Sequence, residues 1–245
     1  MNITPEYSLR RIRFCTLAGV EGVRLEGEEI SGCFVNQPKR FYGVRGKRLF
    51  EEFVNWPTDS KGVLRFTQRF GPLAERPVAG SAFRFRCDHW GGYQEGLRFL
   101  WAILQCGSSQ PATGSWGSFT GGAFGDVVKF DGVGGWRLVN DASDTWEYVN
   151  GALIYNAATL FRFLVLELLA VPHERLRTCA RPDCPHRFFV ARHLKQNYCS
   201  EPCSAWGQRQ WKKQWWTEHG TAWRQQRKES KLKKRGGKNV TRKTP

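Results

Sequence analysis

Four of the eight cysteines in this 245-residue chain fall into two close pairs. The first pair is Cys179-Ala-Arg-Pro-Asp-Cys184, the second is Cys199-Ser-Glu-Pro-Cys203, and fourteen residues separate them. This separation is long enough for a hairpin, so the four thiolates can converge on one tetrahedral ion, a geometry that zinc accepts without redox chemistry. The sequence therefore predicts one structural zinc ion (Zn2+), held by Cys179, Cys184, Cys199 and Cys203.

Residues within each pair favour the tight turns that such a site needs. Pro182 and Asp183 help to turn the first pair, whereas Ser200 can cap a helix that has Pro202 in its opening turn. The dipole of that helix favours nearby thiolates. Four thiolates on one Zn2+ leave a net charge of about −2. Three arginines close in sequence can offset this charge: Arg181, Arg187 and Arg192.

The module around the cysteines is small. We expect its core to consist of Phe188, Phe189 and Tyr198. Because so small a core is not expected to fold alone, metal binding should be coupled to folding. The alternative without metal is a set of four reduced core cysteines.

Two histidines, His186 and His193, are rival ligands because imidazole also binds zinc. Four cysteines already complete the coordination sphere, so neither histidine is needed. A closed four-thiolate site leaves no position for an activated water, which argues against a catalytic zinc. The other four cysteines are isolated, and we expect them to be small buried thiols: Cys15, Cys33, Cys87 and Cys106.

Positive charge is concentrated after the second cysteine pair. The formal net charge is +16, and residues 205–245 contain thirteen Lys and Arg against two acids, a net +11. Charge packed into one segment is typical of an arm that binds phosphate, so the expected partner is nucleic acid. Residues 228–245 are rich in Lys and nearly devoid of apolar residues, and we expect them to be disordered in isolation.

Tryptophans alternate with cations in the helix expected after Cys203. Trp211 and Trp215 lie at positions i and i+4 and can pack, while cations on a neighbouring face can contact phosphate. The candidate nucleic-acid contacts are Arg187, Lys195, Arg209, Lys212, Lys213 and Trp216. DNA is the favoured partner, and stacking of unpaired bases on the aromatic rings leaves RNA and single-stranded DNA open.

Other classes of protein also fit parts of this sequence. The basic helix can instead be a solvated helix lying on the main domain, or the zinc site can be a structural clip in an interaction protein whose tail meets acidic partners. An enzyme in residues 1–170 would need a catalytic constellation. His89 beside Asp88 and Cys87 is better explained as local packing, so we expect no enzyme activity.

The first 172 residues predict a larger α+β domain. Alternating apolar and polar residues favour strands of a small antiparallel sheet at 11–14, 23–26, 32–35 and 40–44. Apolar residues spaced by three and four favour helices over 62–71, over 93–105 and, as the longest helix, from Asp144 to Pro172. The glycine-rich residues 107–135 favour a loop followed by a hairpin.

We divide the chain into an N-terminal α+β domain (1–172), a treble-clef-like zinc module with the basic helix (173–216) and a basic, disordered tail (217–245). The first residues carry no apolar stretch behind a basic start. The apolar segment 152–171 is interrupted by polar and charged residues that would be costly in a bilayer. We therefore expect a cytoplasmic protein that does not associate with membranes.

At the cysteine pairs the chain resembles the bacterial CGNR-type zinc-finger proteins. The matching elements are Cys179 to Cys184, Phe188-Phe189, and Tyr198-Cys199-Ser200 through to Cys203. The Cys-Gly-Asn-Arg element that names the family is Cys203-Ser204-Ala205-Trp206 in this chain.

Two N-terminal segments are also similar to domains of that family: Phe53-Val54-Asn55, and the stretch from Leu64 to Leu73. The resemblance implies a transcription regulator with a larger N-terminal domain. On that basis we expect a DNA-binding regulator whose larger domain senses a small-molecule ligand or mediates assembly.

Overall fold

The computed structural model describes residues 12–42, 48–106, 128–130, 136–138, 144–149 and 152–238. The chain forms two compact units. The first unit contains Met1–Arg177 together with Phe188–Gln196, and the second contains Thr178–Arg187 together with Asn197–Pro245. The chain therefore passes between the units three times. The loop expected within residues 107–127 lies outside the described residues.

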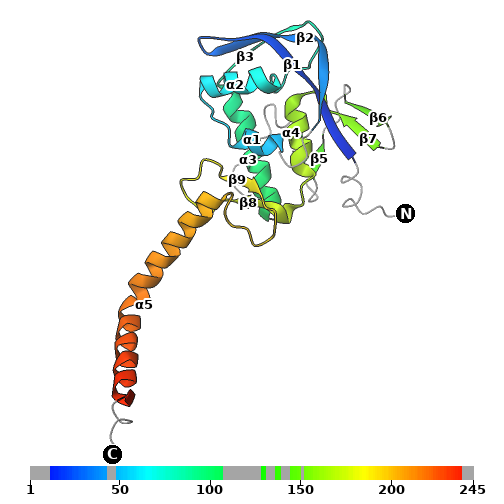
Figure 1. Ribbon diagram of the computed structural model, residues 1–245. Helices are drawn as coiled ribbons and strands as arrows, with labels where there is room; N and C mark the ends of the chain where they lie inside the picture. Colours follow the sequence, from blue (N-terminus) through cyan, green and yellow to red (C-terminus); the bar gives the residue numbers. More distant parts are fainter. Residues whose placement is uncertain are drawn as a thin grey trace, which may run out of the picture. The chain divides into compact units, whose positions relative to one another are not determined.

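A long hairpin begins the first unit (Figure 1). Strand β1 (Ile12–Glu26) pairs antiparallel with β2 (Glu29–Tyr42), and the register shifts twice along β1. The second shift contains Gly22, whose φ of 62° lies in the left-handed region that glycine adopts readily. The four short strands predicted here are thus parts of two long strands, because bulges continue β1 where the sequence suggested turns.

Five strands make the main sheet, in the order β3-β2-β1-β7-β6. Strand β3 (Ala82–Arg86) extends the hairpin on one side, while β7 (Ala152–Asn156) and β6 (Thr145–Val149) lie on the other. All neighbours are antiparallel except β1 and β7, which run parallel. The expected mixture of helices and a small, mainly antiparallel sheet is confirmed.

The long helix predicted from Asp144 to Pro172 is wrong in its first half. Residues 145–149 and 152–156 form the antiparallel strands β6 and β7, in which Val149 faces Ala152. In the sequence the dipeptide between them, Asn150-Gly151, is typical of hairpin turns. The helix α4 spans only Leu160–Leu169, and the side chain of Thr159 caps it by accepting the Arg162 N–H.

Asp144 does not cap a helix but lies in a buried polar cluster. Its carboxylate accepts hydrogen bonds from the Tyr155 hydroxyl at 2.5 Å and the Ala158 N–H at 2.9 Å, and it pairs with the buried Arg162. Burial beside this carboxylate raises the pKa of Tyr155 to about 12. These contacts join the end of β7 to α4 and stabilise the change from strand to helix at this point. The helical spacing of the apolar residues did not indicate this change.

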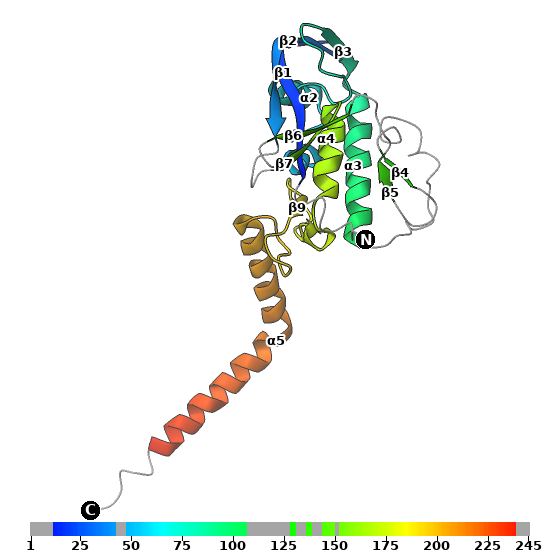
Figure 2. The same cartoon turned by 90° about the vertical axis from the view of Figure 1, so that its right-hand side faces the viewer.

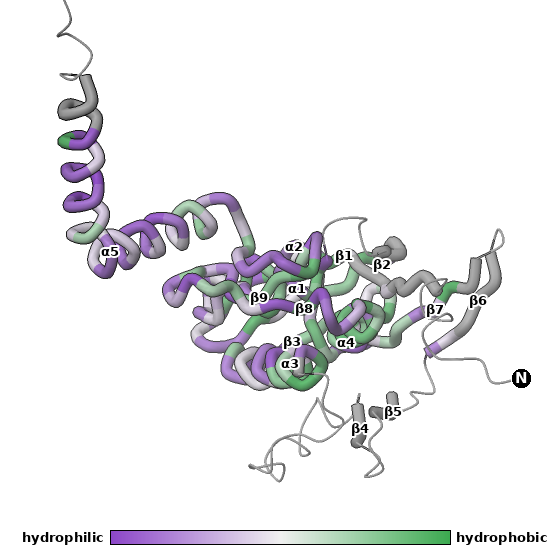
Figure 3. Tube along the Cα trace, turned by 90° about the horizontal axis from the view of Figure 1, so that it is seen from below, coloured by the Kyte–Doolittle hydropathy of each residue, from purple (hydrophilic) through white to green (hydrophobic). Residues whose placement is uncertain are grey.

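Helices α1 (Leu49–Val54), α2 (Ser60–Phe70), α3 (His89–Cys106) and α4 supply the core. The predictions for α2 and α3 are confirmed, with α2 starting two residues and α3 four residues earlier than expected. α3 and α4 lie side by side (Figures 1 and 2), and α4 is markedly apolar in Figure 3. The aromatic rings of Phe53, Phe66 and Trp90 meet at centroid distances of 4.9–5.5 Å.

The remaining elements are short, apart from the last. Strands β4 (Val128–Phe130) and β5 (Trp136–Leu138) form the hairpin expected at the end of the glycine-rich segment. A 3-10 turn, η4 (His173–Arg175), precedes β8 (Leu176–Thr178), which pairs with β9 (Phe188–Val190).

Helix α5 (Glu201–Lys238) is the longest described element and belongs to the second unit. Part of the tail expected to be disordered in isolation is therefore helical, and residues 239–245 lie outside the described part. Across the described residues, every helix falls short of the combination of length and apolar character needed to cross a bilayer.

Candidate metal centre and basic helix

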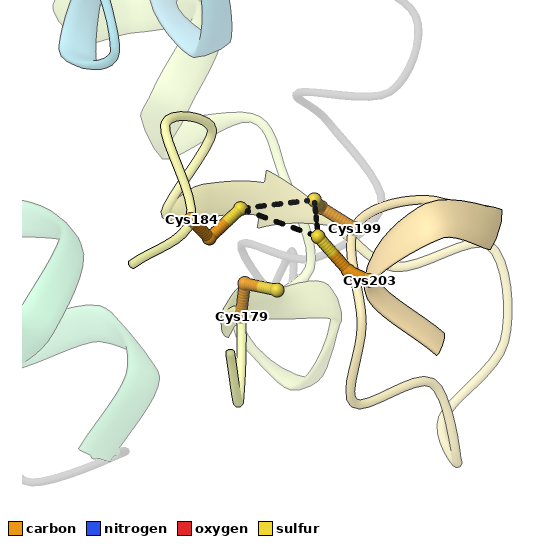
Figure 4. Close-up of side chains that lie close together, drawn as sticks. All are labelled: Cys179, Cys184, Cys199 and Cys203. Carbon is orange, nitrogen blue, oxygen red and sulfur yellow. Dashed lines mark hydrogen bonds between the residues drawn. The ribbon is translucent and has the colours of Figure 1, made fainter. Parts of the chain in front are cut away.

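The sulfurs of Cys179, Cys184, Cys199 and Cys203 all lie within 4.8 Å of one another (Figure 4). The Cys184 sulfur lies 3.4 Å from that of Cys199 and 3.6 Å from that of Cys203, and the latter two are 3.7 Å apart. Three of the four side chains are buried, and Cys199 is half-buried. The predicted convergence of the four cysteines is confirmed, and they can hold a metal ion.

The two pairs reach the centre from different local structures. Cys179 and Cys184 flank a turn closed by the bond from the Cys184 N–H to the Arg181 carbonyl at 3.2 Å. Cys199 lies two residues before α5 and Cys203 lies in its first turn, where the Ser204 N–H donates to the Ser200 carbonyl at 3.0 Å. A loop turn and a helix start thus present two thiols each, as the Pro and Ser positions indicated.

Burial and hydrogen bonds shift the pKa values of the cysteine thiols in different directions. Burial raises the pKa of Cys184, although the His186 N–H that donates to its sulfur opposes this, and burial also raises the pKa of Cys199. The Ser200 hydroxyl lowers the pKa of Cys203 to about 7. The Cys203 thiol therefore releases its proton more readily than the thiols of Cys184 and Cys199.

Arg181 is the one predicted charge-compensating arginine with a described bond at the centre. Its guanidinium binds Asp183 through two hydrogen bonds of 2.9 and 2.7 Å. These bonds, and a further one to the Cys203 sulfur, raise the pKa of Arg181. Arg187 is exposed. Arg192 belongs to the first unit, where its N–H bonds the Gln196 side chain at 2.9 Å.

Neither histidine rival joins the cluster. His186 and His193 are both exposed, and the group of potential ligands contains only the four cysteines. A donor set made of thiols alone favours soft or borderline metal ions over Ca2+ and Mg2+. The centre can therefore take an ion such as Zn2+ with every coordination position filled by protein.

Tyr198 packs across α5 beside the centre. Gly207 is buried, and a Cβ atom placed on it would clash with the Tyr198 hydroxyl oxygen. The ring thus fits against the helix because position 207 has no side chain. The contact fixes the turn that carries Cys199 onto the helix that carries Cys203.

The segment between the cysteine pairs is anchored in the first unit. The Asn55 side chain accepts the Phe188 N–H at 3.0 Å and donates to the Phe188 carbonyl at 2.7 Å, as a neighbouring strand would. Glu51 lies on α1, which Asn55 directly follows, and its carboxylate accepts the Val190 N–H. Burial raises the pKa of this carboxyl. The Phe188 ring contacts Trp101 at 5.7 Å.

The expected module core is therefore only partly formed. Tyr198 does belong to the metal unit, but Phe188 and Phe189 pack with the first unit. Sequence reasoning also missed Asn55 and Glu51 as anchors. No local pattern marks them, since 133 residues separate Asn55 from Phe188.

The predicted nucleic-acid contacts divide between the units. Lys195 is exposed in the first unit, and Arg187 is exposed in the second. The other four are exposed along α5 at spacings of three and four residues: Arg209, Lys212, Lys213 and Trp216. They therefore lie on one face of the helix.

Several tryptophans of α5 remain open to solvent. The exposed fractions are 64% for Trp211, 48% for Trp216 and 37% for Trp223. Trp211, which was expected to pack, does not do so within the described residues. Figure 3 shows α5 as predominantly hydrophilic, so these rings are exposed on a helix without a continuous apolar stripe.

A small pocket in the first unit is the candidate site for the ligand expected of that domain. Its volume is about 90 Å³, and its lining includes Glu75, Phe85, His89, Trp90 and Tyr93. Beside it, Asp88 binds Arg86 and Cys87 is buried, so these two residues serve local structure.

In comparisons with known proteins, no family model, no curated protein and no solved structure matches the chain.

Proposed function

We propose that this protein binds nucleic acid through its second unit, which folds around one structural zinc ion. One observation carries the proposal: the four-thiol centre includes Cys203 of the long helix α5, and the described Lys and Arg side chains of this helix are exposed. The metal fixes the start of α5, and the Lys and Arg side chains of α5 contact the phosphates of the nucleic acid. The role is binding and not catalysis, because four cysteines leave no open coordination position.

Zinc is the ion that the centre fits best. Tetrahedral Zn2+ with Zn–S bonds of about 2.3 Å places its sulfurs about 3.8 Å apart. Three sulfur pairs already lie 3.4–3.7 Å apart. A turn bearing one pair and a helix start bearing the other also support the treble-clef-like arrangement and the proposed kinship with CGNR-type proteins.

The charge of α5 supports a polyanionic partner. Through Lys233 the described side chains of the helix include eight exposed Lys and Arg and three exposed acids. Each cation that replaces a counterion on a phosphate adds affinity that falls with rising salt. Within this proposal the protein is a transcription regulator whose partner is DNA, with RNA as the alternative, and the first unit takes a small ligand.

The test measures nucleic-acid affinity against salt concentration for the full-length, metal-loaded protein. In one variant Arg209, Lys212 and Lys213 are all replaced by Gln. The matched control carries the same changes at three exposed cations of α2: Lys61, Arg65 and Arg69. We expect the α5 variant to bind at least about tenfold more weakly, with a salt slope reduced by about 2 to 3.

Equal affinities for the two variants would contradict the proposal. The α5 cations would then be either solvated side chains or a binding site for acidic proteins. Metal analysis completes the experiment. Freshly purified protein should contain one zinc per chain, and Cys199→Ser should lose it. Zinc-free wild-type protein would remove the metal from the proposal.

A further inference from the structure

We infer that the cationic face of α5 binds unpaired nucleotides, by stacking bases on Trp216 and Trp223 while the neighbouring Lys and Arg bind phosphates. The inference rests on the proposed function and specifies its substrate class as single-stranded nucleic acid.

The first observation is the position of the two rings. Trp216 and Trp223 are seven residues apart and therefore lie on one face of the helix. The same face carries exposed cations at spacings of three and four residues on both sides of the rings: Arg209, Lys212, Lys213, Arg227 and Lys231. Trp211 is more exposed than either ring, but it lies five residues before Trp216, on a different face.

The second observation is that these rings are held at the surface. The Trp216 ring lies over Gly220, where an added Cβ would meet ring atom Cε3 at 2.8 Å. Trp223 meets Trp216 edge to face at 5.2 Å, and the Arg227 guanidinium covers one side of Trp223 at 5.0 Å. The aromatic pair is thus preorganised, yet its rings remain 48% and 37% exposed.

The chemistry of this face favours unpaired bases. Within a duplex the π faces of bases are stacked on each other, and the grooves offer base edges to hydrogen-bonding side chains. Indole has a single donor and no acceptor, so it reads base edges poorly. Unpaired bases offer their faces, and aromatic rings among cations are the usual platform for them.

Two other occupants fit this face less well. A membrane-surface helix needs a continuous apolar face, but here cations flank the tryptophans on the same face. A second copy of the helix would bring one cationic face against another, and the two faces would repel each other. A polyanion that also carries aromatic rings satisfies both the charge and the indoles.

The test uses full-length, zinc-loaded protein and 20-nucleotide probes: oligo-dT, oligo-U, a DNA duplex and an RNA duplex. Vesicles of phosphatidylserine and phosphatidylcholine are a fifth probe. We expect the single strands to bind more tightly than the duplexes, and the two homopolymers distinguish DNA from RNA. Tighter binding to duplexes or to vesicles would overturn the inference.

Substitutions assign the effect to the rings. Trp216→Leu and Trp223→Leu keep an apolar side chain and good helix propensity but remove the stacking surface. Each should lower single-strand affinity at least about fivefold without changing the salt slope. Trp211→Leu is the matched control and should change neither. If the three variants behave alike, the stacking role is wrong.

A photocrosslinking experiment gives a second readout that does not depend on folding of a variant. An oligonucleotide containing 5-iodouridine should crosslink to Trp216 or Trp223, because the reaction favours stacked aromatic rings. Crosslinks confined to other residues would overturn the inference. If the Arg209, Lys212 and Lys213 substitutions weaken binding while the tryptophan substitutions do not, the proposed function stands and the inference alone fails. If no nucleic acid binds, both fail.

Discussion

Tryptophan serves opposite purposes in the two units. Trp90 and Trp101 of the first unit are 1% and 0% exposed, whereas Trp211, Trp216 and Trp223 of the second are 37–64% exposed. The first unit buries its rings against phenylalanines. In the described part of the second unit, the buried hydrophobic side chains are those of Cys179, Cys184 and Cys203. Hydrophobic burial therefore stabilises one unit, whereas the proposed metal ion would stabilise the other.

Removing the metal should give the largest effect and should separate the two units. Structural zinc contributes on the order of 10 kcal/mol to small thiolate modules. We expect a chelator, or Cys184→Ser, to abolish amide protection in residues 178–187 and in the first turns of α5, while the core helices of the first unit stay protected. Hydrogen exchange with mass spectrometry measures both units at once. Unchanged protection around the cysteines would show that the second unit does not need its metal.

The second prediction compares one buried and one exposed tryptophan. Trp101→Ala removes a ring that contacts Phe50 and Phe188 at 5.6 and 5.7 Å, and should lower the free energy of unfolding by about 3–5 kcal/mol. Trp211→Ala should change it by less than about 0.5 kcal/mol. Denaturant unfolding of both variants checks this. A large loss from Trp211→Ala would mean that α5 packs against protein after all.

The third prediction concerns pH and a buried acid of the first unit. Burial raises the pKa of Glu167 from 4.5 to about 7, although the N–H groups of Leu49 and Phe50 oppose the shift. Between pH 4.5 and 7 the folded protein therefore binds more protons than the unfolded chain, and stability falls as pH rises, by about 3 kcal/mol in total. Glu167→Gln should flatten this profile in denaturant titrations. An identical slope in the variant would assign the loss to other groups.

The smallest expected effect is at the anchor of the segment between the cysteine pairs. Asn55→Ala leaves the Phe188 N–H and carbonyl without their side-chain partners and should cost about 1–3 kcal/mol. Asn55→Asp keeps the acceptor and loses the donor, so its Phe188 amide should stay better protected. Exchange at that amide is the measurement. Equal protection in both variants would show that the donor bond carries the anchor.

Sequence patterns predicted the metal centre better than the fold around it. The spacing of the cysteines directly limits where their sulfurs can lie, and the four sulfurs converge as expected. The helix predicted from Asp144 was wrong because apolar residues three and four apart also occur in short paired strands. The Asn150-Gly151 dipeptide, typical of hairpin turns, was the sequence signal that favoured strands instead. The anchoring of Phe188 by Asn55 is a contact between distant residues that periodicity cannot reveal.

The threefold passage of the chain between the units also limits how the protein can change by recombination. A genetic exchange that replaced residues 178–245 as one block would import a foreign 188–196 segment into the first unit. Asn55, Glu51 and Trp101 would then face a segment that had not been selected with them. Residues 178–245 are therefore not expected to work when exchanged between proteins as an independent block. They would have to be exchanged together with α1 and α3.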